Sequence, residues 1–280
     1  MTTTTRRLPE ATHIGGAHLR VQNLERALGF YRDVLGFNVT ENDSKQAALA
    51  ASAVEAPIFR LTEHSGFIPK PQRSTGLYHV AILMPDRPAL ARILRRLLVR
   101  RYPLGGASDH LVSEALYLSD PDGNGLEIYR DRPRSEWRMN GDQIAMATEP
   151  LDADGLLEEA HEQDAGVVAG TTIGHMHLHV SDLTRAEAFY SGLLGFDVVV
   201  RGYPGALFVS AGGYHHHLGL NTWAGKMPPP ANAVGLEDWT LVIPGEEAWA
   251  QAVERTGAVV EGDLASVRDP DGNRLVLAKG

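Results

Sequence analysis

The chain has 280 residues, of which 35 are acidic and 26 basic, giving a formal net charge of -9, and it contains no cysteine. This length suggests about two domains, and the diffuse negative charge argues against nucleic acid or an anionic membrane as a partner. The lack of cysteine excludes disulfides, thiolate catalysis and iron–sulfur clusters. Any metal ion must therefore be held by His, Asp or Glu side chains, and the chain has 12 histidines.

The N-terminal residues MTTTTRRLPEATH lack the apolar segment of a secretory signal. No run of about 18 apolar residues follows anywhere in the chain. We therefore expect a cytoplasmic protein without a membrane partner.

The sequence repeats itself at two levels. Residues 15–40 and 174–199 align without a gap at an offset of 159, with 13 identities in 26 positions. A second similar pair consists of GLYHVAILMPD, which begins at Gly76, and GLEDWTLVIPG, which begins at Gly235. The motif DPDGN also occurs twice. The chain is thus two similar halves of two units each. We place the units at residues 12–65, 75–132, 172–224 and 233–280.

Each unit predicts a strand, then a helix, then further strands. In the third unit, residues 175–180 alternate in the manner of a strand. Ser181 or Asp182 can cap the following helix. A glycine after each helix of units one and three predicts its end, and DPDGN predicts a turn between the last two strands of units two and four. Helical spacing is shown by Ala186, Phe189, Tyr190 and Leu193.

The stretch between the halves is acidic and weakly patterned. We interpret residues 136–170 as a linker with a short helix near Leu156–Ala160. The predicted domains are then residues 1–135, holding units one and two, and residues 171–280, holding units three and four.

A βαβββ unit with a histidine on its first strand and DPDGN before its last strand resembles the vicinal oxygen chelate superfamily, which includes glyoxalase I, extradiol dioxygenases and bleomycin-resistance proteins. The segments SEALYLSDPDGNGLEIYRDRPRSEW and FVSAGGYHHHLGLNTWAG are similar to the catechol 2,3-dioxygenase branch with four modules. The resemblance implies an α+β fold in which four βαβββ modules form two cup-shaped mixed-sheet barrels. Whether the modules pair as 1/2 and 3/4 or as 1/4 and 2/3 stays open.

Strand alternation predicts which side chains face the cup, because successive residues of a strand point to opposite faces. His175 then faces away from its apolar neighbours, His79 lies opposite Tyr78, and Glu127 lies opposite Leu126. The resemblance implies that His79, Glu127 and His175 bind one metal ion. Two histidines and one carboxylate are the facial triad of non-haem iron(II) oxygenases, which leaves coordination positions open.

The other two units lack this triad. Gly16, Asp238 and Val276 stand where His175, His79 and Glu127 stand in the repeat. We therefore expect a single metal site, formed by units two and three. A lone strand histidine is more often structural than a ligand. We therefore interpret His18 as structural, and His177 and His179 as non-ligands that either lie next to the metal ligands or are solvated.

The resemblance also implies catalytic residues beside the metal. The segment YHHHLGL matches the position of an acid–base histidine, which we assign to His216, with His215 and His217 as alternatives because three consecutive histidines leave the register open. Tyr117 and His110 match a tyrosine and a histidine that lie before the turn in the Glu-bearing module. A core position is the competing interpretation for Tyr117, and it is the favoured one for Trp137, Trp223 and Trp239.

The activity implied by the resemblance is iron(II)-dependent extradiol cleavage of catechol or a substituted catechol by O2, giving a 2-hydroxymuconic-semialdehyde-type product. Manganese(II) is compatible with the same ligands. One alternative is a glyoxalase-like isomerase or lyase, which would need a fourth ligand near Leu220 and Asn221, where no carboxylate stands. Another is a non-catalytic small-molecule binder. Relatives often form homo-oligomers, and the ring substituents of the substrate are not determined by the sequence.

Overall fold

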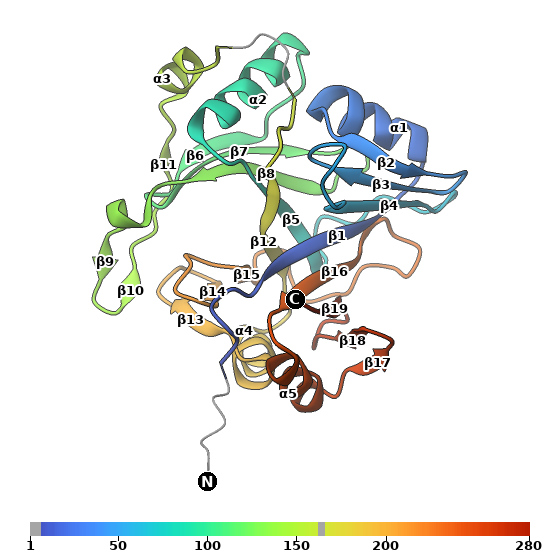
Figure 1. Ribbon diagram of the computed structural model, residues 1–280, viewed down its shortest axis with the longest axis vertical. Helices are drawn as coiled ribbons and strands as arrows, with labels where there is room; N and C mark the ends of the chain where they lie inside the picture. Colours follow the sequence, from blue (N-terminus) through green and yellow to red (C-terminus); the bar gives the residue numbers. More distant parts are fainter. Residues whose placement is uncertain (1–6, 162–165) are drawn as a thin grey trace.

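The computed structural model describes residues 7–161 and 166–280, whose strands form two large curled mixed sheets and one two-stranded hairpin (Figure 1). Each of the four predicted units forms one βαβββ module, which confirms the predicted fold class. The strands of the first half are β1 (His13–Val21), β2 (Asn38–Asn42), β3 (Gln46–Ala50), β4 (Phe59–Glu63), β5 (Gly76–Leu83), β6 (Gly106–Asp109), β7 (Ser113–Ser119) and β8 (Gly125–Asp131). Those of the second half are β12 (Thr172–His179), β13 (Asp197–Val200), β14 (Ala206–Ser210), β15 (Leu218–Asn221), β16 (Gly235–Ile243), β17 (Val259–Glu261), β18 (Leu264–Arg268) and β19 (Arg274–Lys279).

Each sheet combines one module from either half of the chain. In the first sheet the strand order is β17-β18-β19-β16-β1-β4-β3-β2. In the second it is β11-β6-β7-β8-β5-β12-β15-β14-β13, where β11 is the short strand Glu149–Pro150. The antiparallel pairs β1–β16 and β5–β12 join the modules, so module 1 pairs with module 4 and module 2 with module 3. We call the two sheets the β1–β16 sheet and the β5–β12 sheet. The division into domains at residues 1–135 and 171–280 stays a prediction.

One helical segment per module covers the sheets. These segments are α1 (Leu24–Leu28) with the π-helix Gly29–Leu35, α2 (Arg87–Val99), α4 (Leu183–Glu187) with the π-helix Ala188–Leu194, and α5 (Glu246–Thr256). Asp182 caps α4 by accepting a hydrogen bond from the backbone N–H of Arg185, as one of the two predicted caps. The helical segments of modules 1 and 3 end at Gly36 and Gly195, whose φ values of 89° and 106° favour glycine.

The π-helical turn corrects one detail of the predicted helix in module 3. Ala186, Phe189 and Tyr190 are buried, but Leu193 is 43% exposed and Leu194 is buried in its place. A π-helix takes more residues per turn than an α-helix, which shifts the buried position one residue along the chain.

In each half of the chain, the DPDGN turn of the second module forms a hydrogen bond with the helical segment of the first. Asp120 accepts hydrogen bonds from the backbone N–H groups of Asp122 and Asn124 and from the Tyr31 hydroxyl, which reaches it from the helix of module 1. Burial raises the pKa of Asp120 to about 6. In the second half the Tyr190 hydroxyl donates to Asp269 in the same way, at 2.8 Å.

The connection between the halves is more structured than the sequence predicts. It holds a 3₁₀ turn (Arg134–Glu136), the hairpin β9 (Met139–Asn140) and β10 (Gln143–Ile144), the short strand β11 (Glu149–Pro150) and the helix α3 (Ala153–Glu158). The helix overlaps the one expected near residues 156–160. Strand β11 pairs with β6 and so extends the β5–β12 sheet. Within the described residues, no helix is long and apolar enough to cross a membrane.

Candidate metal centre and active-site cavity

Three neighbouring strands of the β5–β12 sheet carry the predicted metal ligands. His79 lies on β5, which pairs with β8 on one side and with β12 on the other. Ala81, two residues after His79, is aligned with Glu127 of β8 and with His175 of β12. Side chains two apart on a strand share a face, so the pairing brings all three predicted ligands to one face of the sheet.

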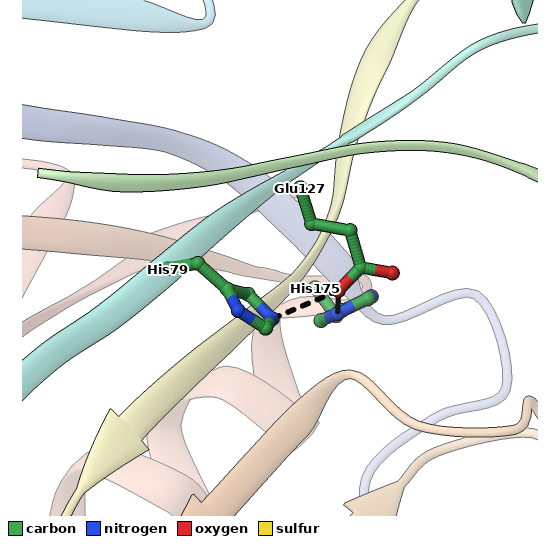
Figure 2. Close-up of side chains that lie close together, drawn as sticks. All are labelled: His79, Glu127 and His175. Carbon is green, nitrogen blue, oxygen red and sulfur yellow. Dashed lines mark ion pairs between the residues drawn. The ribbon is translucent and has the colours of Figure 1, made fainter. Parts of the chain in front are cut away.

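The three side chains converge on one point (Figure 2). The Nε2 atom of His79 lies 2.9 Å from Oε2 of Glu127, and Nε2 of His175 lies 3.4 Å from the same oxygen. One ligand atom of each residue can be chosen so that all lie within 4.8 Å of one another. All three side chains are buried. Residues 48 and 96 positions apart in the sequence thus form one compact group.

The chemistry of this group fits a divalent metal ion. Within the described residues, Nε2 of His79 and both ring nitrogens of His175 are buried without a hydrogen-bond partner. Of these nitrogens, Nε2 of His79 and Nε2 of His175 face the Glu127 carboxylate. Buried polar atoms are nearly always satisfied, so these two nitrogens require an explanation. A cation at their centre supplies it, because each nitrogen that faces the ion would bind it through its lone pair.

The titration behaviour of the group favours the forms that bind metal. Burial lowers the pKa of His175 to about 4, so its imidazole is neutral at pH 7. Burial by itself raises the pKa of Glu127, but the neighbouring His175 and His79 outweigh this effect and hold that pKa well below its usual range. Metal ions bind neutral imidazole and ionised carboxylate.

Two glycines allow the strands of the site to lie close to other groups. A Cβ atom on Gly174, next to His175, would lie 1.8 Å from the Tyr129 hydroxyl oxygen. A Cβ atom on Gly125 would lie 2.0 Å from the carbonyl oxygen of Tyr78, next to His79. A side chain at position 125 would collide with the backbone of β5 next to His79, and one at position 174 would displace the Tyr129 side chain.

A cavity of about 690 Å³ opens onto this group. Its lining includes all six side chains that the sequence assigns to the site: His79, Glu127, His175, His216, Tyr117 and His110. Pockets of this size accommodate small organic ligands. The metal group is therefore accessible to a small molecule.

A chain of hydrogen bonds distinguishes the three consecutive histidines. Nε2 of His215 lies 2.8 Å from Oδ1 of Asp131, and its Nδ1 lies 2.8 Å from Nδ1 of His216. Since a carboxylate only accepts, His215 donates to Asp131 from Nε2. A neutral His215 then accepts at Nδ1 from the N–H of His216, which leaves Nε2 of His216 as an acceptor. His216 lines the cavity, and its ring centroid lies 4.1 Å from that of His175.

His217 faces away from this chain. Its Nδ1 accepts a hydrogen bond from the backbone N–H of Ala211 at 3.2 Å, and it is absent from the cavity lining within the described residues. The geometry therefore supports His216 over His215 and His217 as the residue facing a ligand.

Tyr117 and His110 form a second pair at the cavity. The Tyr117 hydroxyl oxygen lies 2.6 Å from Nε2 of His110, whose Nδ1 lies 2.7 Å from the carbonyl oxygen of Ala147. A carbonyl only accepts, so Nδ1 of His110 donates, and the neutral ring accepts from the Tyr117 hydroxyl. Burial raises the pKa of Tyr117 well above its usual value, so it stays protonated. Tyr117 is thus a cavity residue and not simply a core residue.

His177 and His179 are buried rather than solvated, and both bond to Asn221. The Asn221 side-chain amide donates to Nε2 of His177 at 2.9 Å, and its oxygen accepts from Nδ1 of His179 at 2.6 Å. Asn221 stands where a fourth metal ligand would be expected in a glyoxalase-like site. Both ends of its amide are occupied by histidines.

Three cavity residues could not be found by strand alternation. Tyr78 was expected on the face opposite His79, but a bulge between β5 and β12 leaves it unpaired, and its ring lies 4.7 Å from that of His179. Trp223, expected in the core, lines the cavity and is 48% exposed. Lys70 reaches the cavity from the loop before β5. Bulges depend on pairing partners, which local sequence does not specify.

The corresponding face of the β1–β16 sheet has different chemistry. His18 is aligned with Asp238, and its Nδ1 lies 3.5 Å from Oδ2 of that residue. Arg274 lies 3.5 Å from the same oxygen. The Arg274 guanidinium group thus supplies the positive charge near Asp238. The described residues hold one candidate metal group, the one in the β5–β12 sheet.

The buried histidines predict a pH-dependent stability of the metal-free protein. Burial lowers the pKa of His217 to about 3, whereas the unfolded residue titrates near 6.5. Below pH 6.5 the unfolded chain therefore binds a proton that the folded chain rejects, and stability falls. Between pH 7 and pH 5, this one residue should lower the free energy of unfolding by about 2 kcal/mol. Urea unfolding is measured at both pH values. The free energy of unfolding should fall less in His217→Gln than in the wild-type chain, by about 2 kcal/mol.

The comparison with a variant is needed because Asp120 changes the free energy of unfolding with pH in the opposite direction. Its raised pKa of about 6 makes the folded chain bind a proton more readily as the pH falls. An equal pH dependence for the wild-type chain and His217→Gln would show that His217 is not held neutral by burial.

Known proteins share this fold and sequence. A family model described as Glyoxalase/Bleomycin resistance protein/Dioxygenase superfamily matches residues 11–128 and 172–277. The chain is 49% identical over 272 residues to the catechol-2,3-dioxygenase of Bacillus subtilis (strain 168), with 94% of each chain covered. It therefore belongs to this superfamily and, as predicted, to its catechol-2,3-dioxygenase-like branch of enzymes.

Two solved structures share the fold at low sequence identity. A Bacillus subtilis protein described as a putative dioxygenase superposes with a TM-score of 0.66 at 13% identity, covering 98% of this chain and 86% of its own. Glyoxalase I from Zea mays superposes with a TM-score of 0.58 at 17% identity, covering 96% and 92%. These likenesses show the fold, and the chemistry must be argued from the site.

Proposed function

We propose that the chain catalyses iron(II)-dependent extradiol cleavage of catechol or a substituted catechol by O2, giving a 2-hydroxymuconic-semialdehyde-type product. The observation that carries the proposal is the buried group of two histidines and one glutamate at the cavity. Three protein ligands leave open coordination positions, as a bidentate aromatic diol and O2 require. The chain is also 49% identical over 272 residues to a protein named as a catechol-2,3-dioxygenase.

His79, Glu127 and His175 would hold the metal. When bound, the ion would acidify the hydroxyl groups of the substrate and bring O2 next to the aromatic ring. We favour iron(II), and manganese(II) is compatible with the same donor atoms.

The remaining site residues would manage protons and orient the ring. His216 would take a proton from a substrate hydroxyl at Nε2, because its Nδ1 proton is directed to His215. Tyr117 would hold its hydroxyl proton beside the substrate, with His110 able to exchange it. The aromatic rings of Tyr78, Phe208 and Trp223 line the cavity and would limit the access of water.

The two alternative functions are less well supported. A glyoxalase-like isomerase of the four-ligand type would need a carboxylate near Asn221, whose amide is bonded to two histidines. A non-catalytic binder would have no need of two unsatisfied buried histidine nitrogens that face a carboxylate. The expected assembly into homo-oligomers stays a prediction.

Anaerobic loading with iron(II), followed by catechol and air, tests the proposal. We expect one O2 consumed for each catechol and a yellow ring-fission product. Parallel loading with manganese(II) identifies the metal that supports turnover. Conversion of a hemithioacetal without O2 uptake, and no change in catechol, would contradict the proposal and favour the isomerase.

A further inference from the structure

The cavity is lined by few charged side chains. Within the described residues that line it, Glu127 is the sole carboxylate and Lys70 the sole lysine or arginine. Glu127 belongs to the metal group. Lys70 is thus a positive charge in the cavity that the metal group does not use.

The Lys70 ammonium group has one hydrogen-bond partner in the described residues. Its Nζ donates to the backbone carbonyl of Ser74 at 3.2 Å. An ammonium group has three donors, and no ion pair with a carboxylate forms here within the described residues. Lys70 is half-buried, and this burial lowers its pKa. A partly desolvated cation without an anion is costly unless a ligand supplies one.

The Lys70 side chain lies beside two glycines. A Cβ atom on Gly76 would lie 3.4 Å from Cε of Lys70, and one on Gly235 would lie 3.8 Å from its Cδ. Both glycines have positive φ values, of 103° and 136°, that other residues rarely adopt. The lysine stem therefore passes beside the starts of β5 and β16, where two modules from opposite halves meet.

The same contacts place Lys70 relative to the metal group. Gly76 is aligned with His179, whereas His79 is aligned with His177. The two pairs are two residues apart on β12, which is about 7 Å along the strand. The ring of Tyr78 lies between them, 4.8 Å from that of His79 and 4.7 Å from that of His179. An aromatic ring bound at the metal could thus lie along Tyr78 and direct a substituent toward Lys70.

We propose that Lys70 binds a carboxylate on the substrate, so that the preferred substrate is a catechol with a short anionic side chain. This inference rests on the proposed function, because the metal would fix the diol end of the molecule. The chain as a whole carries a net charge of -9, which disfavours anionic ligands in general. A hydrogen-bonded ion pair with this half-buried ammonium group would offset the unfavourable net charge and should raise the affinity about 10- to 100-fold.

The test compares 3-(3,4-dihydroxyphenyl)propionate with its methyl ester, which has the same ring and no charge. Binding to the iron(II)-loaded protein is measured by calorimetry without O2. The wild-type chain should bind the acid about 10- to 100-fold more tightly than the ester. Lys70→Met should lose this preference through weaker binding of the acid, with ester binding unchanged. Lys45→Met, at an exposed position outside the cavity, should keep it.

A preference for the acid that survives in Lys70→Met, or no preference in the wild-type chain, would overturn the inference. Unchanged ester binding by the variant shows that it is folded. O2 uptake is then measured separately with both compounds. A Lys70-dependent preference without ring cleavage would contradict the proposed function alone, whereas ring cleavage without the preference would contradict the inference alone.

Discussion

Glu127→Gln should reduce ring cleavage by about 1,000-fold or more and should weaken metal binding. The substitution keeps the size of the side chain but removes the negative charge that lies 2.9 Å from His79 and 3.4 Å from His175. Metal ions contribute several kcal/mol to catalysis, and each 1.36 kcal/mol changes the rate tenfold. Metal content after anaerobic loading, and O2 uptake with catechol, measure the two effects.

The duplication of the chain offers a matched control for this experiment. Asp238 occupies the position equivalent to His79 in the β1–β16 sheet, where it lies near His18 and Arg274. Asp238→Asn should leave metal content and ring cleavage unchanged. A stability measurement gives an independent readout, because a ligand at 100 times its Kd stabilises the folded state by about 2.7 kcal/mol. Metal-induced stabilisation that persists in Glu127→Gln would contradict the assignment of this ligand.

His216→Asn should lower kcat by about 100- to 10,000-fold, the range for loss of a general base. Anaerobic binding of catechol to the iron(II)-loaded protein should change little, because the metal ligands are intact. The expected split between kcat and binding follows from the hydrogen-bond chain Asp131–His215–His216, which leaves Nε2 of His216 free to accept a proton.

His217→Gln is the matched control for His216→Asn. His217 is the next residue of the same histidine run, but it bonds to the backbone of Ala211 and is not part of the cavity lining. A glutamine oxygen can accept the same hydrogen bond, so kcat should stay within a few-fold of the wild-type value. A loss of kcat in His217→Gln as large as that in His216→Asn would show that the register of the histidine run is misassigned.

Much of the fold follows from local sequence. The repeat at an offset of 159 establishes that the halves are similar, and alternation along β5, β8 and β12 indicates which side chains share a face. Alternation works where the ladder is regular, as it is between β5 and β8 around Ala81. It fails at Tyr78, where a bulge turns one extra side chain into the cavity. The helical spacing also fails before Gly195, because the extra residue in a π-helical turn makes Leu194 the buried leucine instead of Leu193.

The sequence by itself determined the four modules, the absence of thiolate chemistry and the candidate donor atoms, because these depend on residue type and on spacing along the chain. The tertiary structure decided which modules share a sheet, which histidine of the run at 215–217 faces the cavity, and that Lys70 reaches it. The physical reason is that hydrogen bonds between β5 and β12, and between β1 and β16, join segments far apart in the chain. Their alignment is a property of the packed sheet, and no local pattern encodes it.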